Sequence, residues 1–299
     1  MLYKQLGKST LEISRIGFGC MSLKPGQKDI EAIINAAIKS GINFFDTSDL
    51  YDKGLNEQEV GKAIKQQRPN IILATKVGNR WRPDGSGWDW VPSKQYIFKA
   101  IDESLLRLQT DYIDLYQLHG GTMEDPIDEI IEAFEVLQEK GKIRHYGISS
   151  IRPNVIREYV QRSNIVSVMM QYSLLDRRPE ESCLPLLLQK NIGVLARGSV
   201  ASGLLINKPV KPFLQYSAEE VKLMQEKITE TAAENNIDES QTALQFVLNH
   251  PAITAAIVGI RTHKHLEDAV AALQVPAMND LALASLKMVL PMNTYAEHR

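Results

Sequence analysis

Cysteine is scarce in this 299-residue chain, which carries only Cys20 and Cys183. The two lie far apart in the sequence and form no Cys-x-x-Cys pair, so neither a disulfide framework nor a zinc site built on cysteine is expected. Low cysteine usage of this kind is typical of proteins kept in a reducing compartment. We therefore expect a cytoplasmic protein.

Long apolar runs and an excess of one charge are also missing. No stretch approaches the roughly 18 apolar residues of a membrane span, and the first residues, Met1-Leu-Tyr-Lys-Gln5, lack the basic-then-apolar pattern of a signal peptide. The 34 basic and 36 acidic side chains give a formal net charge of -2, whereas binding to phosphate backbones calls for a basic excess. The sequence thus predicts no membrane and no nucleic-acid partner.

A glycine-rich nucleotide turn is absent as well, although two segments come near one. Gly17-Phe-Gly19 lies inside a strand pattern and lacks the third glycine of a dinucleotide fingerprint. Residues 198–203 have the glycine spacing of a P-loop but are followed by Leu204-Leu205 in place of Lys and Ser or Thr. An open doubly wound sheet would carry the glycine-rich turn after its first strand, so the lack of one favours a closed barrel.

Short apolar segments rich in β-branched residues alternate with amphipathic ones along the chain. The clearest amphipathic segment is 29–40, where isoleucine and alanine recur at helical spacing. Such alternation predicts a parallel α/β architecture. The expected strands are residues 16–20, 42–47, 71–77, 112–118, 143–148, 166–171, 193–196 and 254–258.

Eight strand-helix units without a linker predict one (β/α)8 TIM barrel domain over residues 1–299. We expect residues 3–7 and 11–16 to form an N-terminal β-hairpin at the barrel bottom, and the segment from Met278 onward to add a C-terminal helix. Helix starts with capping boxes are predicted at Asn56-x-x-Glu59 and Ser217-x-x-Glu220.

Polar residues at the ends of the second, third and fourth expected strands are candidates for catalysis, because barrel active sites lie at the carboxyl ends of the strands. The second strand ends near Asp46, with Tyr51 just beyond, the third ends near Lys76, and the fourth ends at His119. Each residue alone is more often structural. Together they bring a carboxylate, a phenol, an ammonium and an imidazole to one rim.

These residues lie in motifs that resemble the aldo-keto reductase family. Phe45-Asp-Thr-Ser-Asp-Leu-Tyr51, followed by Asn56-Glu-Gln-Glu-Val-Gly61, is similar to the family signature of Asp, then Tyr, then Glu-x-x-x-Gly. Ile72-Leu-Ala-Thr-Lys76, Asp111-Tyr-Ile-Asp-Leu-Tyr-Gln-Leu-His119 and Gly141-Lys-Ile-Arg-His-Tyr-Gly-Ile-Ser149 match successive family segments. The resemblance runs essentially from end to end.

The resemblance implies an NADPH-dependent oxidoreductase that reduces aldehydes or ketones to alcohols, with a small-molecule carbonyl substrate and a monomer or weak homo-oligomer as its state. Tyr51 would be the general acid, since a nearby Lys76 ammonium favours phenolate and lowers the phenol pKa. Asp46 would hold Lys76 charged and in place. A neutral His119 would orient the substrate carbonyl.

The cofactor is expected over the later strand ends, where barrels often hold phosphate. The basic cluster near Arg261 favours NADPH over NADH. Three positions depart from the family pattern: Ser150 replaces the usual Asn, Arg197 stands where an aromatic commonly stacks on the nicotinamide, and Ala269 replaces an Asn. The expected cofactor-binding residues are Gly19, Cys20, Met21, Asp46, Ser149, Ser150, Gln171, Arg197, Gly198, Ser199, Val200, Ser202, Gly203, Gly259, Ile260, Arg261, Thr262, His265 and Asp268.

All the tryptophans lie in the Gly-, Pro- and Asp-rich stretch 78–92, directly after Lys76. Loops on the catalytic rim carry substrate contacts, and aromatic rings supply apolar binding area. An equally weighted alternative is that these rings pin a long loop to the barrel. Expected substrate-binding residues are Tyr51, His119, Trp81, Trp88 and Trp90.

Three rival interpretations have sequence features that weigh against them. His263-x-His265 is a possible metal pair, but no third ligand is near, so no metal site is expected. A redox-sensing regulatory subunit would not need all four catalytic positions. An aldolase that used Lys76 as a Schiff-base nucleophile would need a depressed lysine pKa, which Asp46 opposes.

Overall fold

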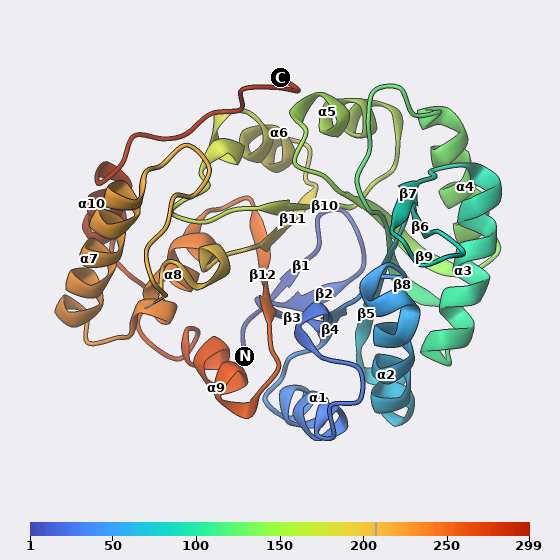
Figure 1. Ribbon diagram of the computed structural model, residues 1–299, viewed down its shortest axis with the longest axis horizontal. Helices are drawn as coiled ribbons and strands as arrows, with labels where there is room; N and C mark the ends of the chain where they lie inside the picture. Colours follow the sequence, from blue (N-terminus) through green and yellow to red (C-terminus); the bar gives the residue numbers. More distant parts are fainter. Residues whose placement is uncertain (207) are drawn as a thin grey trace.

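The computed structural model of the protein describes residues 1–206 and 208–299. Its centre is a closed barrel of parallel strands in the order β10-β11-β12-β3-β4-β5-β8-β9 (Figure 1). The predicted TIM barrel is confirmed, and all the expected strands are found within two residues of their predicted ends. They are β3 (Ile16–Gly19), β4 (Phe44–Asp46), β5 (Ile72–Val77), β8 (Ile113–Leu118), β9 (Ile143–Ser149), β10 (Ser167–Gln171), β11 (Gly193–Arg197) and β12 (Ile253–Gly259).

Helices surround the barrel and bury their apolar faces against it (Figure 1). They are α1 (Ile30–Lys39), α2 (Leu55–Ile64), α3 (Lys94–Leu108), α4 (Ile127–Glu139), α5 (Pro153–Arg162), α6 (Cys183–Gln189), α7 (Ala218–Glu234), α8 (Glu239–Asn249), α9 (His263–Ala271) and the predicted C-terminal α10 (Asp280–Met288). Short 3-10 helices are η1 (Cys20–Ser22), η2 (Tyr51–Gly54), η3 (Lys65–Asn70), η4 (Arg178–Glu181) and η5 (Ala201–Gly203). Among these described segments, none is both long and apolar enough to cross a bilayer.

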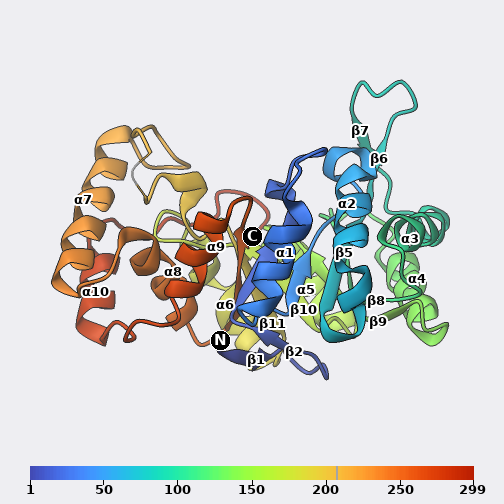
Figure 2. The same cartoon turned by 90° about the horizontal axis from the view of Figure 1, so that it is seen from below.

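The predicted hairpin of β1 (Tyr3–Gln5) and β2 (Glu12–Ser14) closes the bottom of the barrel. Leu6, Leu11 and Ile13 enter one buried apolar cluster with barrel residues such as Met169 and Leu195. Figure 2 shows this hairpin at the opposite end of the barrel from β6 and β7. The lower half of the barrel interior is therefore filled by side chains.

Along each barrel strand, alternate residues face the interior, because successive side chains of a strand point to opposite sides. On β4, β5 and β8, one interior residue is apolar and joins the cluster at the bottom. The next interior residue, two positions on, is polar and lies higher. The pairs are Phe44 and Asp46 on β4, Ala74 and Lys76 on β5, and Leu115 and Gln117 on β8.

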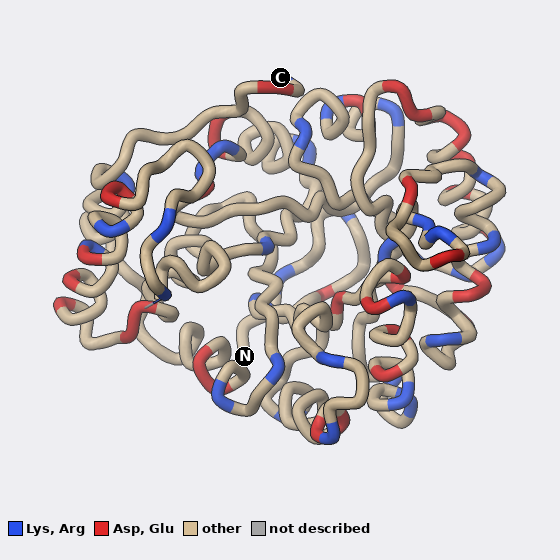
Figure 3. Tube along the Cα trace, viewed as in Figure 1, with Lys and Arg blue, Asp and Glu red and all other residues tan. Residues whose placement is uncertain are grey.

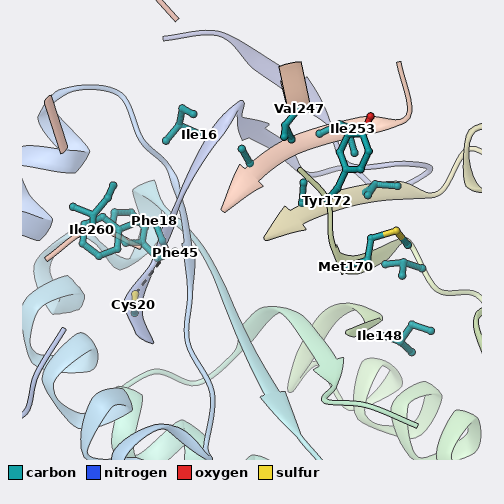
Figure 4. Close-up of a cluster of buried hydrophobic side chains, with 14 of the residues drawn as sticks. Ile16, Phe18, Cys20, Phe45, Ile148, Met170, Tyr172, Val247, Ile253 and Ile260 are labelled. Carbon is teal, nitrogen blue, oxygen red and sulfur yellow. Dashed lines mark hydrogen bonds between the residues drawn. The ribbon is translucent and has the colours of Figure 1, made fainter. Parts of the chain in front are cut away.

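A second apolar core lies between the strands and the helices. Phe18 of β3 and Phe45 of β4 stack with ring centroids 5.4 Å apart, and Figure 4 shows them beside Ile260. Charged residues of both signs are interspersed on the outer helices instead (Figure 3). The two rings lie at paired positions of the adjacent strands that lead to Cys20 and Asp46.

The helix-start predictions had mixed outcomes. Ser217 and Glu220 form the predicted capping box on α7. The predicted box at Asn56 and Glu59 is wrong, because α2 already begins at Leu55. Asn56 lies inside α2 and uses its buried amide to join two strand ends, accepting from Thr47 Oγ1 at 2.7 Å and donating to Cys20 O at 2.9 Å.

The tryptophan-rich stretch 78–92 is more ordered than the expected loop. β6 (Asn79–Trp81) and β7 (Trp88–Trp90) pair as an antiparallel hairpin, with Trp81 opposite Trp88. The hairpin rises from the carboxyl-terminal end of the barrel strands (Figure 2). Turn residues in the middle of the stretch hid this pairing from the sequence pattern.

Helices α2 and α3 approach closely at Gly61, the last residue of the Glu-x-x-x-Gly motif. A Cβ at this position would lie 2.6 Å from Leu108 Cα and 2.7 Å from Arg107 O. Backbone atoms cannot move aside as a flexible side-chain end can. Gly61 therefore sets the distance between the two helices that flank β5.

We predict that Gly61→Ala destabilises the protein by about 1–3 kcal/mol, the usual range for overpacking. In a helix with free space at the glycine, the same change stabilises the protein by about 1 kcal/mol. A loss of stability would therefore indicate that α2 and α3 are in close contact at Gly61. The free energy of unfolding in urea measures it, with Lys62→Ala at the next, exposed position as control. A stability equal to or above wild type would contradict the prediction.

Candidate active site

The barrel brings all four predicted catalytic residues to its carboxyl-terminal rim. Asp46 and Lys76 lie inside the barrel on adjacent strands β4 and β5, and His119 directly follows β8. The backbone N–H of His119 donates to Val77 O at 2.7 Å, which continues the β5–β8 ladder by one step. Tyr51 begins η2, on the loop that follows β4.

The Lys76 ammonium is the centre of the cluster and has three hydrogens to donate. Nζ lies 2.6 Å from Asp46 Oδ2, 2.7 Å from Thr47 O and 3.2 Å from the Tyr51 hydroxyl oxygen. All three donors are therefore used. Because Tyr51 accepts from Lys76, its own hydroxyl proton is left to donate to another group.

The Asp46–Lys76 ion pair is almost completely buried, with side-chain exposures of 5% and 1%. Gln117 Nε2 donates to the second carboxylate oxygen, Oδ1, at 3.1 Å. Burial opposes the charge on Lys76, but the carboxylate of Asp46 and then Tyr51 outweigh burial, so the Lys76 pKa lies above its usual value. Lys76 is thus a fixed cation at neutral pH.

The Tyr51 phenol is protonated in this environment. Burial raises its pKa, and Lys76 pulls the pKa down without reversing that effect. The sequence-based expectation gave the direction of the Lys76 contribution correctly but left out the burial of the ring. Tyr51 therefore keeps its hydroxyl proton at neutral pH.

His119 is a neutral imidazole beside Tyr51. Burial, followed by the charges of Lys76 and Arg197, lowers its pKa to about 3. Its Nδ1 lies 3.1 Å from Ser48 Oγ, and its ring meets that of Tyr51 edge-on, with centroids 5.9 Å apart. One ring nitrogen, Nε2, remains for a ligand.

A tight turn directly after Tyr51 leads the chain into α2. Asp52 and Lys53 both adopt left-handed backbone conformations, with φ of 49° and 58°. Each such non-glycine residue costs about 1–2 kcal/mol. Trp81 Nε1 donates to Leu50 O at 3.0 Å, which ties the β6–β7 hairpin to this turn.

The three tryptophans have different surroundings. Trp90 packs against Gly78 and Gly120, which follow β5 and β8, and its Nε1 donates to Asp125 Oδ1 at 2.9 Å. Trp81 donates to the backbone of Leu50, the residue before Tyr51. Trp88 is 49% exposed on the outer part of the hairpin. Trp81 and Trp90 therefore have structural contacts next to the catalytic cluster.

Several residues expected to bind the cofactor come together at the ends of β9, β10 and β11. Ser149 and Ser150 are buried, and Gln171 of β10 is paired in register with Arg197 of β11. Arg197 is partly buried, and burial lowers its pKa. The carboxylate of Asp176, a possible partner for Arg197, is bound by Arg178 through two contacts of 2.7 Å.

The loop after β11 contains several residues with left-handed backbone conformations. Gly198 and Gly203 have positive φ, and so does Ser202 between them. The buried Ser199 Oγ has no hydrogen-bond partner within the described residues. Its hydroxyl is therefore free to bind a ligand that reaches this loop, which also contains Val200.

The remaining expected cofactor residues lie at the ends of β3 and β12, which are neighbours in the barrel. Gly19 is paired in register with Gly259. Cys20 and Ile260 are buried, whereas Met21 is 62% exposed. The structure thus places the two groups of expected residues on the same rim as Asp46, Tyr51, Lys76 and His119.

A charged segment continues from this rim into α9. Thr262 caps the helix by accepting from the backbone N–H of His265 at 3.2 Å, and Asp268 is paired with Lys264 at 2.6 Å. The Arg261 and His265 side chains are exposed. Arg261 O accepts from Gln27 Nε2 at 2.9 Å, which joins the loops after β3 and β12.

Sequence reasoning missed three residues that contact Asp46, Lys76 or His119. Gln117 holds Asp46, the Thr47 carbonyl holds Lys76, and Ser48 holds His119. Strand periodicity gave a signal for Gln117, since it lies two positions before His119, which directly follows β8. No sequence pattern indicated the roles of Thr47 and Ser48.

Comparison with known proteins found relatives that match along the whole chain. The Aldo/keto reductase family model matches residues 15–289. The chain is 49% identical over 308 aligned residues to a Bacillus subtilis (strain 168) protein described as uncharacterized oxidoreductase YqkF, with 100% of both proteins covered. The holo form of aldo-keto reductase AKR11C1 from Bacillus halodurans superposes with a TM-score of 0.95 and 48% identity, covering 100% of this chain and 99% of that one. Its apo form, with the same coverage, gives 0.87 and 45%.

We predict that Asp46→Asn destabilises the fold by about 3–5 kcal/mol, since removing one partner of a buried ion pair leaves an uncompensated charge. The free energy of unfolding in urea at neutral pH measures the loss. Glu59→Gln breaks an exposed pair with Lys62 and is the control, with an expected loss of at most about 1 kcal/mol. Equal losses in the two variants would contradict the buried-pair account.

Proposed function

This chain belongs to the aldo-keto reductase family of oxidoreductases, and from that premise we propose that it reduces aldehydes or ketones to alcohols with NADPH. The observation that carries the proposal is the hydrogen bonding of Lys76. Its three donors hold Asp46, Thr47 O and Tyr51, so the Tyr51 proton points away from the lysine and is available to a substrate.

The general acid in this proposal is Tyr51. NADPH, when bound, supplies a hydride to the carbonyl carbon. The carbonyl oxygen then gains negative charge and takes the phenol proton of Tyr51. Lys76 stabilises the resulting phenolate across the 3.2 Å contact, and Asp46 keeps Lys76 charged. The raised pKa of Tyr51 keeps the proton in place until the transition state forms.

His119 orients the substrate in this proposal. A neutral imidazole whose Nδ1 is held by Ser48 presents Nε2 to the same space as the Tyr51 hydroxyl. An N–H on that nitrogen would donate to the carbonyl oxygen and fix its direction relative to Tyr51. Trp90, packed over Gly120 next to His119, is the tryptophan best placed to contact the substrate.

The residues present fit a dinucleotide cofactor. The unpartnered Ser199 hydroxyl and the positive-φ backbone at Gly198 suit a pyrophosphate, because such turns direct backbone N–H groups at an anion. Ser149, Ser150 and Gln171 would hold the nicotinamide amide. Arg261, exposed at the start of α9, would pair with a ribose 2′-phosphate and favour NADPH over NADH.

The structure weighs against the aldolase alternative. A Schiff-base lysine needs a neutral amine with a free lone pair. Lys76 instead donates all three hydrogens, and its pKa is raised. A purely regulatory role predicts cofactor binding without turnover, so oxidation of NADPH in the presence of carbonyl compounds distinguishes the two.

We predict that Tyr51→Phe lowers kcat/KM for carbonyl reduction by at least about 10²-fold, as expected for loss of a general acid. Cofactor binding, followed by fluorescence titration, stays near wild type. Tyr3→Phe removes a hydroxyl that donates to Gly41 O at the barrel bottom and is the control. Retained turnover in the Tyr51 variant would sink the assignment.

For cofactor choice, we predict that Arg261→Ala weakens NADPH binding roughly 10- to 150-fold, the equivalent of a charge-assisted contact of about 1.5–3 kcal/mol. NADH binding changes little, because NADH has no 2′-phosphate. Titration of both cofactors measures the difference, with Arg144→Ala at the opposite end of the barrel as control. Equal losses for both cofactors would mean that Arg261 does not contact the 2′-phosphate.

A further inference from the structure

A series of hydrogen-bonded polar groups leads away from His119 into the protein and has no role in the proposed carbonyl reduction described so far. Ser48 Oγ lies 3.1 Å from His119 Nδ1 and 3.2 Å from Asp49 Oδ1. It also accepts from the backbone N–H of Leu50 at 3.2 Å. Ser48 is fully buried, and Asp49 is only 8% exposed. The order is Asp49, Ser48, His119, with the imidazole at the catalytic end.

The direction of this series of hydrogen bonds decides which nitrogen of His119 carries the ring proton. A serine hydroxyl has one hydrogen and two lone pairs, and one lone pair of Ser48 is taken by Leu50. If Ser48 donates to Asp49, it must accept from His119, and the ring proton lies on Nδ1. If Ser48 donates to His119, it must accept from Asp49, and the ring proton lies on Nε2.

The surroundings of Asp49 favour the neutral carboxylic acid, which can donate. Its Oδ2 is buried and has no hydrogen-bond partner within the described part of the chain. The nearest cation, Arg107, is already bound to Glu57 Oε2 at 2.7 Å, and Thr75 donates to the other oxygen of Glu57 at 2.5 Å. Burial, and then the charge of Glu57, raises the pKa of Asp49 to about 8.

Groups from every neighbouring element influence the protonation of Asp49 and His119. Glu57 of α2 and the phenols of Tyr96 and Tyr116 face Asp49 without supplying a positive charge. Lys76 and Arg197 face His119 and disfavour a second ring proton. The titratable and charged groups around these three residues are Glu57, Tyr96, Arg107 and Tyr116 near Asp49, and Tyr51, Lys76 and Arg197 near His119.

We propose that Asp49 and Ser48 are positioning residues for His119: the neutral carboxylic acid of Asp49 donates to Ser48 Oγ, and the Ser48 hydroxyl donates to His119 Nδ1. His119 then carries its proton on Nε2 and donates to the substrate carbonyl. This inference rests on the proposed role of His119 in orienting that carbonyl. Ionisation of Asp49 reverses both hydrogen bonds, moves the ring proton to Nδ1 and leaves a lone pair facing the carbonyl oxygen.

The first test compares the pH dependence of kcat/KM in the wild type and in Asp49→Asn. In the wild type, carbonyl reduction falls about tenfold or more as alkaline pH ionises Asp49. The carboxamide of the variant does not titrate, so this alkaline fall is absent below the pH at which Tyr51 ionises. Ser48→Ala likewise lacks the fall and has a lower kcat throughout. The same alkaline fall in Asp49→Asn would overturn the proposal.

The second test observes His119 without substrate or turnover. Nitrogen NMR of the ligand-free, 15N-histidine-labelled protein separates the two neutral tautomers, and His119→Asn identifies the His119 signals among the six histidines. We expect the proton on Nε2 near pH 6 and a shift toward Nδ1 above the Asp49 pKa in the wild type only. A proton on Nδ1 at pH 6, or the same shift in Asp49→Asn, would overturn the proposal. An active Tyr51→Phe would instead refute the proposed function and leave this result standing.

Stability supplies a control for the protonation of Asp49. A folded-state pKa raised above the unfolded value means that folding retains a proton, so stability is present at low pH and is lost as pH rises toward the folded pKa. Urea unfolding of the wild type at pH 5 and pH 8 should therefore show a loss that Asp49→Asn lacks. An identical pH dependence in the two proteins would mean that Asp49 is ionised in the fold and would overturn the proposal.

Discussion

The buried ion pair between Lys76 and Asp46 is the interaction on which the rest of the site depends. Two charges removed from water are stable only when their remaining donors and acceptors are also satisfied. Here Thr47 O, Tyr51 and Gln117 supply those partners. Each group that satisfies the pair is thereby positioned by it. The hydrogen bonds of this ion pair thus hold together residues from β4, β5 and β8 and from the loop that follows β4.

The sequence predicted the scaffold well because strand alternation and helix periodicity are local patterns. The positions of Asp46, Lys76 and His119 at the ends of neighbouring strands were predicted for the same reason, since strand ends can be located from periodicity. Their catalytic roles stay predictions. The sequence did not predict the capping status of Asn56 correctly, because its amide satisfies two distant strand ends and not its own helix. Tertiary contacts of this kind leave no trace in residue spacing.

The Glu-x-x-x-Gly motif gains a physical meaning from the structure. Glu57 joins Thr75 of β5 to Arg107 of α3, and Gly61, one helical turn later, lets α3 approach the α2 backbone. Both residues therefore secure the same junction, which lies behind the strand that carries Lys76. Glu57 and Gly61 are four residues apart, and this spacing places both of them on the side of α2 that faces α3.

The β1–β2 hairpin has an electrostatic consequence beyond closing the barrel. Its leucine and isoleucine side chains share a buried apolar cluster with Phe44 and Ala74, which lie two residues before Asp46 and Lys76 on β4 and β5. Water that entered this cluster would raise the local dielectric constant and weaken the attraction between Asp46 and Lys76. The first fourteen residues thus keep water away from Lys76 without touching it. The pKa of Tyr51, which Lys76 lowers, depends on that exclusion of water.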